Sequence, residues 1–237
     1  MEKGLSQEGL KILACVTMLV DHAALLFGGS PWLRVIGRLA FPIYCFLLTE
    51  GIRHTRDKSR YLSRLLFAAI ISEPVYDLVL YPGVGIWQHQ NVLWTLTLGC
   101  AMLWCMRMIR KPIGKLAVML LFALAAQLMR ASYGSSGIYM IALFALCREV
   151  PEGKWALAAG LLAINWLMGS FTVPVFGLDV PVQLFAELAL IPIFLYSGEK
   201  RRRSKIVSWG FYLFYPMHLL ALWGIAQCIT GALCFGI

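Results

Sequence analysis

The chain has 237 residues, of which 60% are hydrophobic and 14% are charged, and its formal net charge at pH 7 is +9. Its mean hydropathy of +0.74 leaves too little polar surface to cover a water-soluble globule, so we expect the bilayer to be its solvent. The 21 basic residues fall in short clusters between apolar runs, which argues against one nucleic-acid-binding patch, and no nucleic-acid partner is expected.

Charged and Gly/Pro-rich breaks divide the chain into apolar stretches that can cross a membrane as helices. The stretches lack the alternating pattern of a membrane β-barrel. We therefore predict an all-α, polytopic integral membrane protein with a single domain over residues 1–237. The nine predicted spans are 10–28, 33–53, 62–81, 92–109, 115–131, 136–149, 155–169, 181–197 and 206–232.

The distribution of Lys and Arg predicts which ends of these spans face the cytoplasm. If the N-terminus is cytoplasmic, all of the 21 basic residues except Arg34, Arg38 and Arg130 fall on the cytoplasmic side. The sequence therefore predicts a cytoplasmic N-terminus and an external C-terminus. The seven cysteines lie in or beside apolar runs without metal-ligand spacing, so no metal is expected.

The first predicted span carries two adjacent ionisable residues, Asp21 and His22. At 1.5 Å per residue, His22 lies about 16 Å beyond Lys11, near the middle of a hydrocarbon core of about 30 Å. A charge at that depth costs at least about 2.5 to 3.5 kcal/mol, so such residues face a partner or a wet cavity.

The second predicted span carries polar groups near both ends. Arg34 and Arg38 are four residues apart and therefore share one face near the outer end. Glu50 and His54 repeat that spacing at the inner end, where Glu50 is the stronger candidate because it lies deeper. Pro42 between the two pairs removes a helical hydrogen bond and is expected to bend the helix.

Later spans add further candidates at similar depth. Glu73 lies near the middle of the third span, and His218 lies in the last span beside Tyr215. We therefore predict a cavity lined by spans one, two, three and nine. Asn91 precedes the fourth span, where it either contributes to a site or caps the helix.

An acidic residue beside a histidine is typical of general-base chemistry, because a carboxylate fixes the imidazole tautomer. Adjacent residues point about 100° apart on a helix, so Glu73 is an alternative to Asp21 as the acid that serves His22. Arg38 is suited to stabilising an oxyanion. A purely structural network of Asp21, Arg38 and Glu73 is a further possibility, but it leaves the two histidines unexplained.

Several segments together resemble the TraX family, which is named for a conjugation protein that N-acetylates pilin. They are LKILACVTMLVDH at 10–22, LRVIGRLAFPIYCFLLTEGIRHTRDKSRYLSRLL at 33–66, ISEPVYDL at 71–78, QNVLWTLTLG at 90–99 and YPMHLL at 215–220. The match covers most of the chain and is densest over 10–100. In the family's later tyrosine–glycine motif, an acidic residue commonly precedes the tyrosine, whereas Ser132 precedes Tyr133 here.

The resemblance implies a multi-pass acyltransferase of the bacterial cytoplasmic membrane that uses cytosolic acetyl-CoA as its acyl donor. The implied acceptor is an amine or hydroxyl of a small molecule, glycan or peptide associated with the envelope. The resemblance makes His22 the leading catalytic base. The other implied site residues are Asp21, Glu73 and Arg38 as catalytic groups, and Arg34, Glu50, His54, Asn91, Tyr133, Tyr215 and His218 as binding groups.

A noncatalytic membrane assembly factor is one alternative function class, and the leading alternative is a proton-coupled transporter of a small solute. Asp21, His22, Arg38 and Glu73 would then line the pathway instead of a catalytic site. Paired Gly/Pro-broken spans in two corresponding halves are typical of such transporters, and the sequence does not have this symmetry.

Overall fold

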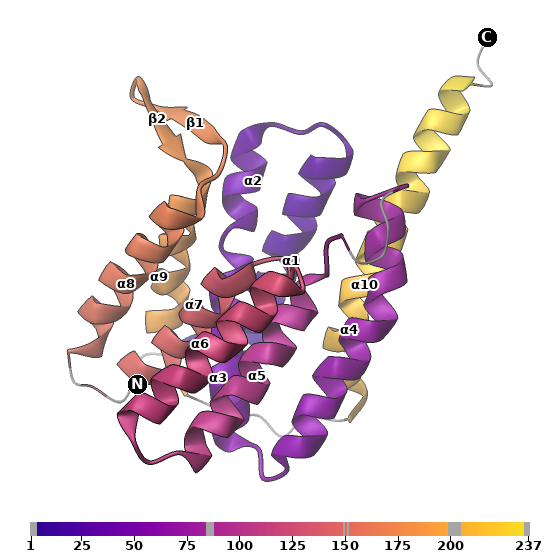
Figure 1. Cartoon of the computed structure of the whole chain (residues 1–237). Helices are drawn as coiled ribbons and strands as arrows, with labels where there is room; N and C mark the ends of the chain where they lie inside the picture. Colours follow the sequence, from indigo (N-terminus) through magenta and orange to yellow (C-terminus); the bar gives the residue numbers. More distant parts are fainter. Residues whose placement is uncertain (1–3, 84–87, 149, 151, 199–204, 235–237) are drawn as a thin grey trace.

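The computed structural model describes residues 4–83, 88–148, 150, 152–198 and 205–234, apart from the side chains of 205–208 and 230–234. The described part is a helical bundle with one small β-hairpin (Figure 1). Its elements are α1 (Gln7–Leu26), α2 (Pro31–Gly37), α3 (Ala40–His54), α4 (Lys58–Leu80), α5 (Val92–Met108), α6 (Pro112–Leu128), α7 (Gly134–Cys147), α8 (Gly153–Met168), β1 (Thr172–Val175), β2 (Leu178–Pro181), the 3-10 helix η1 (Val182–Ala189), α9 (Leu190–Phe194) and α10 (Lys205–Cys234).

Short polar side chains fix where three of the helices begin. The side chain of Ser6 accepts a hydrogen bond from the backbone N–H of Gly9 at the start of α1. Asp57 does the same for α4, and Asn91 for α5. These caps satisfy N–H groups that have no partner within the helix. The capping role considered for Asn91 is therefore confirmed.

The outer surface of the bundle is apolar, as expected of a membrane protein. Large side chains such as Leu128, Trp155 and Leu167 are 75%, 82% and 83% exposed, whereas several polar side chains are buried. By length and composition, the segments Gln7–Leu26, Pro31–His54 and Trp209–Ile229 are long and apolar enough to cross a membrane. The all-α prediction is confirmed apart from the hairpin. The number of spans and their orientation stay predictions.

Two of the predicted spans differ from regular helices. The second is interrupted at Arg38 and Leu39, between α2 and α3. Pro42 explains the position of this break, because its ring nitrogen cannot donate a hydrogen bond to the carbonyl of Arg38 four residues earlier. The predicted span 181–197 is formed by η1 followed by α9 and is preceded by the antiparallel β1–β2 hairpin, which the sequence analysis did not predict.

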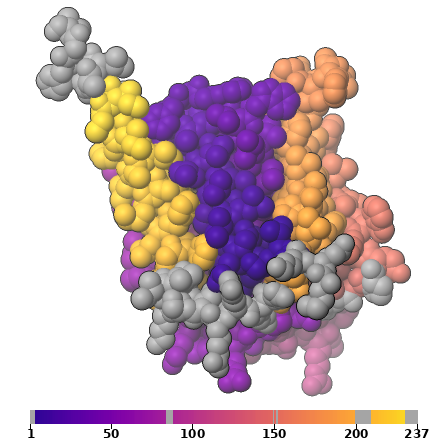
Figure 2. All heavy atoms as spheres, turned by 180° about the vertical axis from the view of Figure 1, so that it is seen from behind, coloured from indigo at the N-terminus to yellow at the C-terminus, as the bar shows by residue number. Residues whose placement is uncertain are grey.

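Helix α3 lies in the middle of the bundle and provides much of its core. Eleven of its residues between Ala40 and Ile52 are buried, and it packs against α1, α5, α7 and η1. On the face seen in Figure 2, α1 and α2 lie between α10 and the 172–194 segment. The N-terminal part of the chain therefore packs against elements from the C-terminal part, α1 against α10 and α2 against η1.

The chain reverses direction between successive predicted spans, so alternate connections gather at the same end of the bundle (Figure 1). The α3–α4, α5–α6 and α7–α8 connections lie at this lower end of the bundle, which we call the basic end. The opposite end holds α2, the β-hairpin and the end of α1, and we call it the outer end. This arrangement agrees with the alternation that the positive-inside rule requires.

Candidate functional site

A cavity of ≈350 Å³ lies toward the outer end, between α1, α2, α3, α4 and α10. We call it the outer cavity. The four spans that the sequence analysis predicted to line a cavity all contribute to it, together with the 168–171 segment. Of the predicted site residues, the outer cavity is lined by Asp21, His22, Arg34, Arg38, Tyr133 and Tyr215.

His22 on α1 and His218 on α10 form a hydrogen-bonded pair at this cavity. The Nδ1 atom of His22 lies 2.7 Å from the Nε2 atom of His218, and the two rings are stacked with centroids 5.0 Å apart. The other nitrogen of His218, Nδ1, lies 2.8 Å from the carbonyl oxygen of Phe214. A residue of the first helix is therefore held in place by the last helix.

These two contacts determine the tautomers of both neutral rings. A carbonyl oxygen only accepts, so Nδ1 of His218 carries the hydrogen and its Nε2 carries the lone pair. Nδ1 of His22 must then donate to His218, which leaves the lone pair of His22 on Nε2. Among the described residues, none hydrogen-bonds this Nε2 atom. His22 is thus prepared to accept a proton from a group in the outer cavity.

Asp21, which is adjacent to His22 in the sequence, binds two arginine side chains. One amino group of Arg38 lies 2.7 and 2.8 Å from its two carboxylate oxygens, and Nε of Arg34 lies 2.7 Å from Oδ1. Asp21 therefore holds two guanidinium groups at the cavity wall and does not hydrogen-bond His22. A Cβ atom on Gly37 would overlap the Asp21 side chain, so glycine at this position permits the close approach of α2 to α1.

The Asp21 cluster leaves the outer cavity with an excess of positive charge. Two guanidinium groups face one carboxylate. The side chain of Arg34 is 22% exposed and that of Arg38 is 17% exposed. Each guanidinium has five N–H donors, and the contacts with Asp21 and with the carbonyl oxygen of Arg34 occupy only part of them. The remaining donors are suited to a negatively charged oxygen.

Glu73 belongs to a separate polar cluster beside the start of α5. Its Oε2 atom accepts hydrogen bonds from Nδ2 of Asn91 at 2.5 Å and from Nε1 of Trp94 at 2.8 Å. The backbone N–H of Asn91 lies 3.3 Å from both carboxylate oxygens. Neither carboxylate that the sequence analysis considered as the partner of His22 therefore fills this role, because His218 does.

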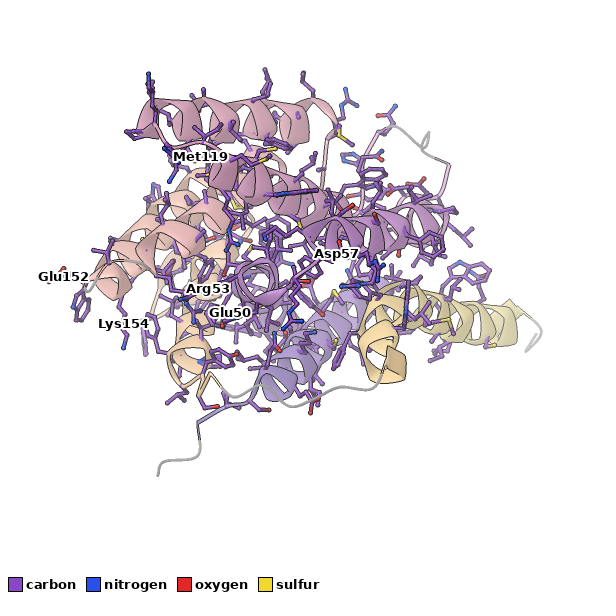
Figure 3. All side chains as sticks on the ribbon, turned by 90° about the horizontal axis from the view of Figure 1, so that it is seen from below. Glu50, Arg53, Asp57, Met119, Glu152 and Lys154 are labelled. Atoms are coloured by element: carbon purple, nitrogen blue, oxygen red, sulfur yellow. The ribbon has the colours of Figure 1, made fainter. Side chains whose placement is uncertain are left out.

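Glu50 and His54 lie together on α3, outside the outer cavity. Glu50 is 2% exposed, its carboxylate forms an ion pair with Arg148 just after α7, and Nε2 of His54 lies 3.6 Å from Oε2 of Glu50. This cluster lies toward the basic end, where Figure 3 labels Glu50 beside Arg53. The predicted site residues thus fall into three groups, and only the group around His22 lines the outer cavity.

A second, narrower cavity of ≈140 Å³ adjoins the outer cavity and extends toward the basic end. Both cavities are lined by Met18, Tyr44, Val92 and Tyr215, which places their junction beside α1 and α10. At its other end the narrow cavity is lined by Lys11, whose ammonium group lies 5.1 Å from the ring centroid of Phe211. Together the cavities extend from the basic end to the His22 region.

Several residues of these clusters were missed by the sequence analysis. Gln183 and Ser132 both line the outer cavity. Gln183 lies in a segment without a recognisable motif, and Ser132 precedes Tyr133 in the tyrosine–glycine motif. The side-chain nitrogen of Gln183 also donates a hydrogen bond to Oδ1 of Asn165 at 3.2 Å, and both side chains are buried. The position of Trp94 could have suggested its role, because Trp94 follows Asn91 by one helical turn within the segment 90–99. Arg148 had no such signal beyond its place in a loop predicted to be cytoplasmic.

The chain is similar to known proteins over almost its whole length. The family model described as TraX protein matches residues 6–226. The chain is 35% identical over 231 residues to a Dichelobacter nodosus protein named probable fimbrial assembly protein FimC, serogroup H1, with 90% of this chain and 92% of the relative covered.

Two Escherichia coli relatives are both named Protein TraX. One is 32% identical over 160 residues, which cover 65% of this chain and 62% of the relative. The other, from strain K12, is 29% identical over 219 residues, which cover 90% and 84%. No solved structure matches the chain.

Proposed function

Because the chain belongs to the TraX family, we propose that it is a membrane-embedded acyltransferase that moves an acetyl group from cytosolic acetyl-CoA to an envelope-associated amine or hydroxyl. We place it in the bacterial cytoplasmic membrane as a multi-pass protein with a cytoplasmic N-terminus. The name of the D. nodosus relative refers to fimbrial assembly, so pilins and the glycans attached to them are the first acceptors to test.

The observation that carries this proposal is the orientation of His22. Its Nδ1 atom is held by His218, and its Nε2 lone pair is the basic position left at the outer cavity. A general base needs a positioned lone pair within reach of the nucleophile's proton. His22 would take the proton from the acceptor as the acceptor's nitrogen or oxygen bonds to the thioester carbonyl carbon.

The carbon–sulfur bond then breaks, and the proton on His22 passes to the departing thiolate. The products are the acetylated acceptor and free CoA, and His22 returns to its neutral form. During the step His22 carries a positive charge, and the lone pair of His218 Nε2 stabilises it through the His22 Nδ1–H donor. We regard His218 as a positioning residue for this reason.

Arg34 and Arg38 are suited to the negative charge that the carbonyl oxygen develops when the nucleophile attacks. Both side chains line the outer cavity beside His22 and are fixed by Asp21. Donors that are already oriented cost little reorganisation at the moment of reaction. Asp21 then acts by holding the two arginines, and Glu73 by holding the start of α5 through Asn91.

The two adjoining cavities suit substrates that arrive from opposite ends. We assign the narrow cavity, with Lys11 near its basic end, to the acyl-bearing arm of the donor. The wider and more polar outer cavity takes the acceptor. The acetyl group would pass from CoA to the acceptor at the junction of the two cavities, where Tyr44 and Tyr215 line both.

The experiment is to supply the purified full chain with acetyl-CoA labelled in its acetyl group and with envelope fractions from bacteria that lack this protein. The proposal predicts that label enters the envelope material and that an equal amount of CoA is released. A proton-coupled transporter would give neither product. Label found only in acetyl-CoA after prolonged incubation with competent envelope fractions would overturn the proposal.

A further inference from the structure

The basic end contains a third cavity, of ≈120 Å³, between α3, α5, α6 and α7. Four cationic side chains line it: Arg53 from α3, Arg107 from α5, Lys115 from α6, and Arg148 just after α7. Figure 3 looks at this end from below and labels Arg53 near its middle, with Lys154 at its edge. We call this third cavity the cationic cavity.

The charges of the cationic cavity are only partly compensated by the protein. Glu50 is buried behind it and pairs with Arg148. Arg107 donates to the carbonyl oxygen of Ile52 at 3.4 Å, which leaves its charge in place. Within the described part of the chain, Arg53, Arg107 and Lys115 form no ion pair. Arg53 and Arg107 are exposed and Lys115 is half-buried, so three cations without an ion pair line one open cavity, although like charges repel each other.

The positive-inside rule explains why basic residues occur at this end, but not why four helices direct them into one cavity. An exposed loop keeps its cations apart in water, where their repulsion is weak. A cavity with several guanidinium and ammonium donors is instead the arrangement that binds phosphate, because guanidinium N–H groups match its oxygens in pairs.

We propose that the cationic cavity binds a phosphate group, in contact with Arg53, Arg107 and Lys115. This site is distinct from the two adjoining cavities and does not depend on the proposed acyl transfer. The headgroup of an anionic phospholipid and the phosphates of a soluble nucleotide such as CoA share this chemistry.

The surroundings of Lys115 favour the lipid. Helix α6 presents an apolar face on the outside of the bundle, where Ile113, Leu116 and Leu120 are 70%, 45% and 49% exposed. An acyl chain along this face would leave its headgroup at the level of Lys115, close to the start of the helix. Anionic lipids are attracted to basic pockets between membrane helices on the cytoplasmic side.

The test is native mass spectrometry of the full chain in detergent, titrated in separate arms with dioleoyl-phosphatidylglycerol, dioleoyl-phosphatidylcholine, CoA and inorganic phosphate. The variant is Arg107→Gln/Lys115→Gln. The matched control is Arg60→Gln/Lys154→Gln, which removes the same charge from the same end but from side chains that do not line the cavity. Arg53→Gln/Lys115→Gln is a second variant that keeps the bond from Arg107 to α3.

The site predicts that both cavity variants lose roughly tenfold in affinity for phosphatidylglycerol, with the control within about twofold of the wild type. Phosphatidylcholine carries a quaternary ammonium beside its phosphate, so its weaker binding should change little among the four proteins. If the same loss occurs for CoA or inorganic phosphate and not for the lipid, the phosphate comes from a soluble ligand. Equal affinities of the cavity variants and the control for all four ligands would overturn the site.

Discussion

The side chains of His22 and His218 are 196 positions apart in the chain, yet their Nδ1 and Nε2 atoms lie 2.7 Å from each other. This contact joins the first helix to the last and leaves the Nε2 lone pair of His22 for the outer cavity. A second contact, from Nδ1 of His218 to the Phe214 carbonyl oxygen, fixes the direction of the hydrogen bond between the rings. The two histidines therefore act as one unit.

Replacing His218 tests its role as a positioning residue. We expect His218→Ala to lower kcat about 100-fold with little change in KM, because His22 loses the acceptor that orients it. His218→Gln should restore part of the rate, since its side-chain oxygen can accept from Nδ1 of His22. Steady-state kinetics with acetyl-CoA measure both parameters. A rise in KM at unchanged kcat would assign His218 to substrate binding instead.

The stability of the bundle should depend strongly on Asp21. Asp21→Asn leaves two partly buried guanidinium groups without a counter-charge, and we expect about 3 kcal/mol of destabilisation, or a Tm lower by roughly 6 to 12 °C. Asp57→Asn is the matched control, because the Asp57–Arg60 pair is exposed. The control should shift Tm by no more than about 2 °C. Equal shifts in both variants, measured by thermal unfolding in detergent, would contradict the role of Asp21.

Glycine at position 37 should be required for the geometry of the arginines. A methyl group there overlaps Asp21, so Gly37→Ala should push α2 away and lower kcat at least about tenfold. Gly224→Ala in α10 is the control, because a Cβ atom at that position meets no neighbour within 4 Å. Its activity should match the wild type. If Gly37→Ala is equally active, the close packing of α2 on α1 does not matter for catalysis.

The contacts of Glu73 predict that its replacement affects folding more than chemistry. Glu73→Gln keeps the shape but replaces one accepting oxygen by an NH2 group, which cannot accept from Asn91 or Trp94. We expect a Tm lower by several degrees, with kcat of the folded protein within about threefold of the wild type. A loss of about 1,000-fold at unchanged Tm would place Glu73 in the chemical step.

Much of the helical architecture could be predicted because apolar periodicity and charge are local properties of the sequence. The spans predicted at 10–28 and 92–109 correspond to α1 and α5 within a few residues. The 172–181 hairpin was missed because its strands are only four residues long and contain Pro174 and Pro181. Pro42 was expected to bend a helix, but the break lies earlier, where the carbonyl of Arg38 loses its donor.

The composition of the outer cavity was also partly predictable. Ionisable residues inside apolar spans identified Asp21, His22 and Arg38, because their burial requires a partner or water. Which groups pair could not be inferred, since helix packing decides it. Asp21 is adjacent to His22 but faces Arg38, and His22 meets His218 from the far end of the chain. Sequence distance carries no information about such contacts.

The proposed role of His22 as the base for acetyl transfer is tested by the turnover of His22→Ala. The purified variant is given labelled acetyl-CoA and envelope fractions, with His54→Gln as a control from the basic end of the bundle. We predict a loss of at least about 1,000-fold in label transfer and CoA release, with Tm close to the wild type and near-normal activity of the control. Transfer by His22→Ala at the wild-type rate would contradict the account.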